Sequence, residues 1–123
     1  LAELDTSVAG SLDERVQRLV AQRLRLFEAI AAVGTVARLR APFQPLIASE
    51  LATARRFWRG QLRQLFAPEL RVLGKPTAAY VVASIDVLTS YESVQLLRDD
   101  QRLSSSQVAH ALVHAVSALV RPS

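Results

Sequence analysis

The feature that most constrains this chain is a predicted helix over residues 77–98, because its apolar side chains fall on two separate faces. At about 100° per residue, the first face carries two tyrosines and two valines, Tyr80, Val87, Tyr91 and Val94. The second face carries Val82, Ile85 and Leu96. A small domain has a single core and can cover only one of these faces. We therefore expect another subunit to cover the other one.

A further helix is predicted over residues 104–120. Its start is marked by Ser104 followed by Gln107, which is the spacing of a capping box. Alanines on its flanks allow another helix to pack closely. Together with residues 77–98, this helix is expected to form an intersubunit four-helix bundle, with two helices from each copy around a two-fold axis. The candidate interface residues are Val82, Ile85, Thr89, Leu96, His110, Val113, His114 and Ser117.

The amino-terminal half is also predicted to be helical. Residues 1–10 have weak periodicity and are interpreted as a loop or frayed turn. A capping-box spacing at Ser11 and Glu14 begins a helix that should continue to about Leu39, because the following proline, Pro42, disfavours helix.

A second amphipathic helix is predicted over residues 45–66, and residues 67–76 are interpreted as a linker because they end in Gly74 and Pro76. The sequence contains no alternating strand pattern. We therefore predict an all-α fold with four main helices, in which residues 11–123 form one domain.

Composition limits the class of protein. No apolar run approaches the roughly 20 residues that a membrane-spanning helix needs, so we expect no membrane segment and, by default, a cytoplasmic protein. The absence of cysteine excludes disulfides and thiolate metal sites. The sequence begins at Leu1 and contains no methionine, so we expect a further segment to precede it.

Positive charge is concentrated in residues 11–75, which carry eleven arginines and one lysine against five acids. Clustered arginine is typical of phosphate binding, so a nucleic-acid-binding helical domain is one interpretation. These arginines are spread along helical faces, however, without glycine-rich or aromatic-interleaved blocks. Solvated helix surface is therefore the interpretation that we favour.

No set of residues in the sequence has the spacing of a catalytic site. His110 and His114 lie one helical turn apart, as in metal-binding helices, but the chain has no third histidine and no adjacent glutamate to complete such a site. No serine lies in a nucleophile elbow, and no glycine-rich phosphate loop is present. We therefore expect no enzyme activity, no metal and no cofactor.

Two charged residues interrupt the apolar stripe of the first predicted helix, Arg38 close to its centre and Arg23 nearer still. For Arg23 the position is the more unusual. Three explanations are open: its stem is buried while its head reaches water, it pairs with an internal acid, or it faces a cavity that binds something polar. Large and small side chains alternate near it, which fits either a filled core or a pocket lined by aromatic residues. The candidate pocket residues are Arg23, Phe27, Ile30, Trp58, Leu62, Phe66, Tyr80, Ser84 and Tyr91.

The carboxyl end contains three motifs in the order Leu88-Thr89-Ser90-Tyr91-Glu92-Ser93, Leu97-Arg98 and Leu103-Ser104. This order resembles the end of TetR/AcrR-type transcriptional repressors. Three upstream segments are similar to the effector domain of the same family in its arginine-rich bacterial members: Val20-Ala21-Gln22-Arg23, Leu26-Phe27-Glu28 and Phe66-Ala67-Pro68-Glu69-Leu70. The resemblance covers nearly all of residues 11–121.

The resemblance implies a regulator with two parts: a helix-turn-helix domain that binds an operator, and an effector domain that dimerises through its last two helices and binds a small hydrophobic inducer. No helix-turn-helix is found in this sequence, so DNA binding would need an amino-terminal domain outside it. Binding of the effector would release the repressor from DNA. The alternative is a helical dimerisation or interaction module with a filled core and no ligand.

Overall fold

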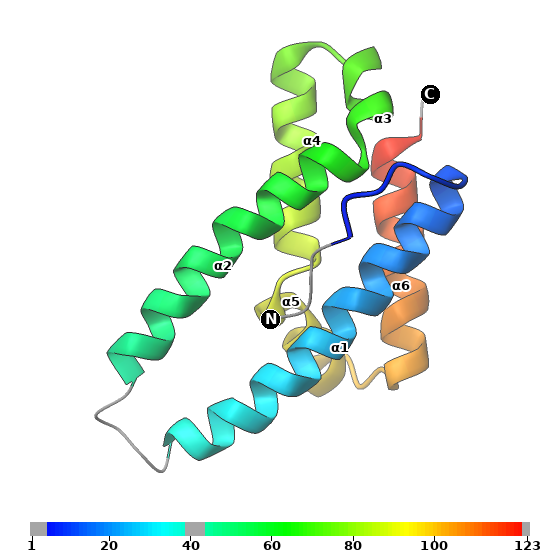
Figure 1. The fold of residues 1–123 in the computed structure, drawn as a ribbon. Coiled ribbons are helices and arrows are strands. Elements are labelled where there is room, and N and C mark those ends of the chain that lie inside the picture. Colours follow the sequence, from blue (N-terminus) through cyan, green and yellow to red (C-terminus); the bar gives the residue numbers. More distant parts are fainter. Residues whose placement is uncertain (1–4, 39–43, 122–123) are drawn as a thin grey trace.

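The structure of the chain is a computed structural model that describes residues 5–38 and 44–121, with side chains described for residues 5–29 and 53–121. The described residues contain six α-helices, one π-helical turn and no strand (Figure 1). In order they are α1 (Leu12–Arg38), α2 (Gln44–Leu65), α3 (Ala67–Val72), α4 (Lys75–Leu88), α5 (Tyr91–Gln95), the π-helical turn η2 (Leu96–Asp100) and α6 (Ser105–Val120). The all-α prediction is therefore confirmed for the described part of the chain. None of its helices combines the length and the apolar character that crossing a membrane would need.

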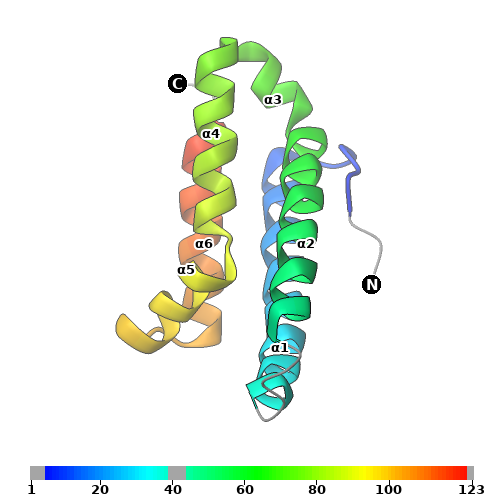
Figure 2. The same ribbon diagram turned by 90° about the vertical axis from the view of Figure 1, so that its left-hand side faces the viewer.

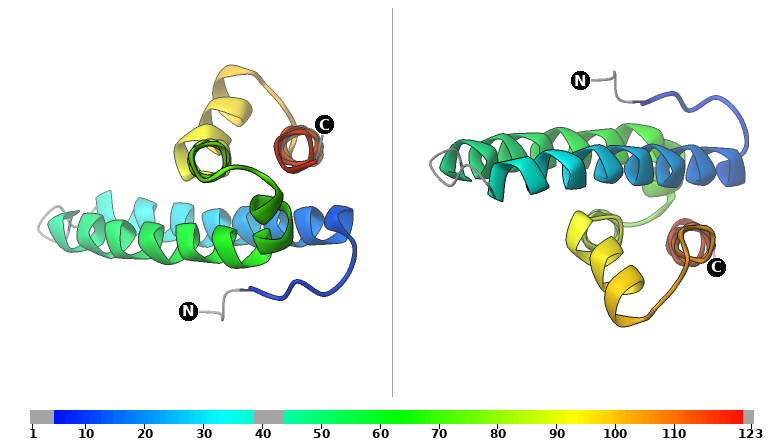
Figure 3. Two further views of the ribbon diagram at one scale, coloured as in Figure 1. Left: turned by 90° about the horizontal axis from the view of Figure 1, so that it is seen from above. Right: turned by 90° about the horizontal axis from the view of Figure 1, so that it is seen from below.

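The helices form two layers. The long helices α1 and α2 run antiparallel in the first layer, and α4 and α6 lie side by side across them in the second (Figures 1 and 2). Seen from above and from below, α4 and α6 appear end-on beside the lengthwise α1 and α2 (Figure 3). The short α3 carries the chain from the first layer to the second, and α5 with η2 links α4 to α6.

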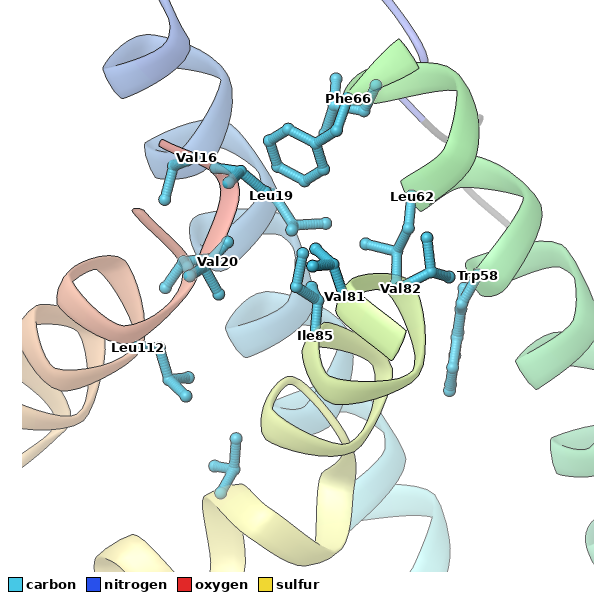
Figure 4. Close-up of a cluster of buried hydrophobic side chains, with 14 of the residues drawn as sticks. Val16, Leu19, Val20, Trp58, Leu62, Phe66, Val81, Val82, Ile85 and Leu112 are labelled. Atoms are coloured by element: carbon cyan, nitrogen blue, oxygen red, sulfur yellow. The ribbon is translucent and has the colours of Figure 1, made fainter. Parts of the chain in front are cut away.

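The apolar core fills the space between the layers (Figure 4). Each of the four long helices contributes to it through residues that are at most 2% exposed, among them Leu19 of α1, Leu62 of α2, Ile85 of α4 and Leu112 of α6. Complete burial of such a side chain stabilises a fold by about 1.5–3 kcal/mol. The two layers are therefore held together by burial of these amphipathic faces.

Both predicted capping boxes are present. At the start of α6, Ser104 Oγ accepts a hydrogen bond from the Gln107 amide at 3.2 Å, and the Ser104 amide donates to Gln107 Oε1 at 2.9 Å. At the start of α1, Ser11 Oγ accepts from the Glu14 amide at 3.1 Å, and the Ser11 amide donates to Glu14 Oε1 at 3.3 Å. Each box satisfies amide groups that the first turn of a helix leaves without partners.

Two predicted boundaries are wrong. Residues 67–76 are not simply a linker, because α3 occupies Ala67–Val72 with Pro68 in its first turn, where proline is tolerated since that amide has no helical partner. The helix predicted over residues 77–98 is also not continuous. It ends at Leu88, and Ser90 then caps a new helix by accepting a hydrogen bond from the Ser93 amide at 3.2 Å.

Hydroxyl groups explain this break. Thr89 Oγ1 donates to the Ile85 carbonyl at 2.7 Å, and Ser90 Oγ donates to the Val87 carbonyl at 2.6 Å. The Ile85 carbonyl keeps its helical bond from the Thr89 amide at 2.9 Å. The Val87 carbonyl, which a longer helix would have paired with the Tyr91 amide, accepts from the Ser90 hydroxyl instead. Side chains after the break therefore belong to a different helix with a different orientation, and one helical wheel cannot place all of residues 77–98.

Residues 5–10, which belong to the segment interpreted as a loop, form no helix, and polar side chains hold them against the first layer. Arg18 donates to the Asp5 carboxylate at 2.8 Å and to the Ser7 and Ala9 carbonyls at 2.9 and 3.0 Å. Gln61 Nε2 of α2 donates to the Asp5 carbonyl at 2.8 Å. The turn into α1 passes through Gly10 at φ 87°, a conformation that favours glycine.

A bidentate ion pair fixes α1 against α3. Arg15 Nη1 and Nη2 donate to the two Glu69 carboxylate oxygens at 2.6 and 2.9 Å, and Nη1 also donates to the Leu65 carbonyl at 2.9 Å. The side chains of Arg15 and Glu69 are only 7% and 14% exposed, so water screens the pair weakly. These hydrogen bonds from Arg15 hold the pKa of the Glu69 carboxyl below its ordinary value of 4.5.

Replacing Glu69 with glutamine should lower the free energy of unfolding at pH 7 by about 3 kcal/mol, because it leaves the Arg15 charge buried without its counterion. Since the folded pKa of Glu69 is lowered, the stabilisation is complete above pH 4.5 and is lost as the pH falls through the lowered value. Urea unfolding at a series of pH values should therefore show a steeper acid loss in the wild type than in Glu69→Gln.

Asp13→Asn is the matched control, because Asp13 pairs with Arg121 at 2.8 Å but the two side chains are 62% and 60% exposed. This variant should change stability little, since exposed ion pairs contribute little. Equal losses in the two variants would show that burial does not distinguish the Arg15–Glu69 pair.

Candidate functional site

The candidate site is centred on Arg23, whose guanidinium lies against the aromatic residues of α1 and α2. Arg23 Cζ lies 5.1 Å from the centre of the Trp58 ring, and Nη2 donates to the Trp58 carbonyl at 3.3 Å. Phe27 contacts Trp58 edge to face at 5.9 Å between ring centres, and it contacts Tyr91 in the same way at 5.7 Å. Trp58 lies at one edge of the core cluster in Figure 4, so these rings extend the core towards the start of α5.

The guanidinium of Arg23 does not reach water. The residue is 1% exposed, and this burial lowers the pKa of Arg23 from its ordinary value to about 10, against the opposing effect of the Asp86 charge. The group thus stays protonated at neutral pH. Its Nη1 atom has no hydrogen-bond partner, which is costly for a buried donor. Of the three explanations left open by the sequence, a charged head that reaches water is therefore wrong.

A cavity of about 380 Å³ lies beside this cluster, where the first layer meets the junction of α4 and α5. Its lining comes from α1, α2, α4 and the start of α5: Arg23, Arg55, Trp58, Arg59, Asp86, Val87, Thr89, Ser90, Tyr91 and Glu92. Arg55 donates to the Glu92 carboxylate, and Arg59 Nη1 lies 3.7 Å from Asp86 Oδ2. The cavity therefore combines aromatic surface with five charged side chains, a larger charged share than most small-molecule sites have.

The described residues also form other concave regions. Tyr91 also borders a smaller cavity of about 260 Å³, towards Phe27 and Val108. An open groove of about 720 Å³ runs between α1 and α6, where Asp13 and Gln17 face His110 and His114. In the described residues, no three histidine, aspartate or glutamate side chains gather closely enough to hold a metal ion.

The structure brings together only some of the predicted pocket residues. Arg23, Trp58 and Tyr91 line the cavity, and Phe27 packs against two of them. Leu62 and Phe66 are fully buried in the core instead. Two others lie away from the cavity, since Tyr80 is 72% exposed and Ser84 is exposed on α4. The predicted pocket residue Ile30 has a side chain outside the described residues.

The predicted interface residues are also divided. Three of them, Val82, Ile85 and Thr89, are at most 4% exposed in the core of a single chain, so they are not available to a second copy. The exposed members are Leu96, His110 and His114, whereas Val113 is half-buried and Ser117 is buried. On α4 the exposed apolar residues are Tyr80 and Val87. The face of α4 predicted to meet a second subunit, with Val82 and Ile85, thus packs inside the chain, and Tyr80 and Val87 of the other face stay outside.

The sequence interpretation missed Arg55, Arg59 and Asp86 as members of the site. A local signal was present, because Arg55 and Arg59 flank Trp58 at the spacing that places residues on one side of a helix. Asp86 lies beside the buried apolar face of α4, and its side chain is 25% exposed. Nothing in the local sequence indicates that Asp86 faces α2, because that depends on how the two layers pack.

Replacing Arg23 with methionine should leave the free energy of unfolding unchanged or raise it by about 1 kcal/mol or more, because an incompletely paired buried charge is exchanged for an apolar side chain of similar length. Arg15→Met is the matched control and should lose about 3 kcal/mol, since it separates Glu69 from its bidentate partner. Chemical unfolding of both variants measures the difference. A large loss in Arg23→Met would identify Arg23 as a structural residue and not as part of a site.

Comparison with known proteins places the chain in no family. No family model matches the sequence, and neither the curated proteins nor the solved structures provide a match. Any function assigned to the chain therefore depends on its own residues and geometry.

Proposed function

We propose that this chain is the effector-sensing and dimerisation domain of a TetR-like transcriptional regulator from a bacterium. The proposal combines the sequence resemblance described above with a two-layer helical fold that has a cavity where the layers meet. A small, largely hydrophobic effector would bind in this cavity. DNA would be bound through an amino-terminal domain outside the described sequence, in a protein of the cytoplasm.

The observation that carries the proposal is the cavity beside Arg23, Trp58 and Tyr91. These residues belong to α1, α2 and α5, so a ligand there would contact both layers at once. A ligand changes an equilibrium between two arrangements only if it binds them unequally. A molecule held between the layers has this property, because its contacts change when α4 and α5 move relative to α1 and α2.

The outward side of the second layer supports pairing of two copies. Tyr80 and Val87 of α4 are 72% and 64% exposed, although they are large apolar residues. Leu96 of η2, the turn that leads to α6, is 62% exposed. Small neighbours such as Ala83 would let a second helix approach α4 closely. We propose a homodimer in which the exposed faces of α4 and α6 pack on those of a second copy, so that a shift of α4 within one chain changes the spacing of the pair.

One observation favours the alternative of an interaction module with no ligand. The core between the layers is filled by side chains that are mostly less than 5% exposed, and the cavities lie at its edges. In that case the exposed apolar face of α4 would be the functional surface and the cavity would have no occupant. The two functions differ in whether small molecules stabilise the chain.

A thermal-shift screen of small hydrophobic compounds tests the sensing function. A compound at about 100 times its dissociation constant stabilises the folded state by about 2.7 kcal/mol, which should raise the melting temperature by on the order of 5–10 °C. The shift should disappear in Tyr91→Ala, which removes a cavity wall, and persist in Tyr80→Ala, which changes the chain's other tyrosine. A screen without hits would leave the interaction module as the function.

Sedimentation velocity tests the dimer. The wild-type chain should sediment with the mass of two copies, and Tyr80→Glu should raise the dimer dissociation constant at least about ten-fold, because it places a charge on the exposed apolar face of α4. Phe57→Glu is the matched control, since Phe57 is 65% exposed on α2 in the other layer. A wild-type chain that stays monomeric at high micromolar concentration would contradict the dimer.

A further inference from the structure

The charged groups that line the cavity are unequally paired. The Glu92 carboxylate accepts a hydrogen bond from Arg55, and Asp86 Oδ2 lies 3.7 Å from Arg59 Nη1. Each acid thus has its own arginine at the edge of the cavity. The third arginine, Arg23, forms no ion pair with any carboxylate of the described residues, and its Nη1 has no hydrogen-bond partner. One positive charge in the lining is therefore left without a counterion.

The contacts that Arg23 does make compensate this charge only in part. The bond from Nη2 to the Trp58 carbonyl is long at 3.3 Å, and the contact of the guanidinium with the Trp58 ring stabilises the charge only modestly. The cost of burying an unpaired ion is larger than this. Asp86 attracts the guanidinium through space but makes no hydrogen bond with it among the described residues.

From these observations we propose that the cavity binds a small monoanionic ligand, a monocarboxylate with an aromatic or aliphatic body, whose carboxylate accepts hydrogen bonds from the Arg23 guanidinium. Its body packs against Trp58 and Tyr91 in the space of about 380 Å³ between the layers. This inference rests on the proposed sensing function and names the chemical class of its effector.

The number of uncompensated charges in the lining determines which ligand charge the cavity prefers. The lining holds three arginines against two acids, and the Asp86 charge acts on both Arg59 and Arg23, so a single negative charge on a ligand would balance the lining. A second negative charge on the ligand would meet Asp86 and Glu92 with no free cation to offset it. A neutral ligand would leave Arg23 as it is, and a cationic one would be repelled.

Binding of matched acids and amides by the 123-residue chain tests the inference. The probes are hydrocinnamate with hydrocinnamamide, and octanoate with octanamide, because each pair has nearly the same shape and differs in charge. Calorimetry gives the affinities, and fluorescence of Trp58, the chain's one tryptophan, reports binding at the cavity. At least one acid should bind about ten- to a hundred-fold more tightly than its amide, as expected for hydrogen bonds to a charged group.

Variants assign the effect to Arg23. Arg23→Met should remove the preference for the acid, and Arg23→Lys should retain part of it, because lysine keeps the charge but loses the fork of donors. Arg63→Met is the matched control, since Arg63 is an exposed arginine of the same helix as Trp58 and does not line the cavity. Circular dichroism checks that each variant is folded.

Three results would overturn the inference, and they separate it from the proposed function. Acids and amides that bind equally well would show that the cavity takes neutral hydrophobic effectors, which leaves the sensing function in place. Acids that bind Arg23→Met as tightly as the wild type would assign the charge preference to the surface arginines. If none of the probes binds and the wider screen also gives no hits, both the anionic ligand and the sensing function fail.

Discussion

The contact between α4 and the α1–α2 layer decides which surfaces of this chain remain outside. α4 has two apolar faces, and the burial of Val81, Val82 and Ile85 against the first layer leaves Tyr80 and Val87 in water. The same contact directs Asp86 towards Arg59 of α2. The core, the exposed face and the lining of the cavity therefore follow from a single packing choice.

Features specified by neighbouring residues could be predicted from the sequence, whereas features specified by distant contacts could not. The capping boxes at Ser11 and Ser104 are local, and α1 and α6 begin where those patterns indicate. The choice between the two faces of α4 depends on which one meets α1 and α2, and both are about equally apolar. The end of α4 had a local signal in its serine and threonine hydroxyls, which outweighed the apolar periodicity.

In the candidate site, too, some residues could be predicted from the local sequence and others could not. Arg23 could be singled out because a charge on an apolar stripe is anomalous, and Trp58 and Tyr91 because large aromatic residues tend to be buried. Arg55 and Arg59 belong to the site because they pair with acids that lie far along the chain, on α4 and α5. Such pairs become visible only when the two layers are assembled. The sequence thus indicated the buried centre of the site, and the structure added its charged edge.

The anchoring of residues 5–10 has a mechanical consequence. Arg18 and Gln61 attach the Asp5 backbone and side chain to α1 and α2 by hydrogen bonds. Gln61 lies one turn from Trp58 along α2, and Arg18 lies on the same helix as Arg23. A rotation of α1 against α2, the two helices that hold Arg23 and Trp58, would therefore pull on both hydrogen bonds of Asp5 and be felt at the start of the described chain.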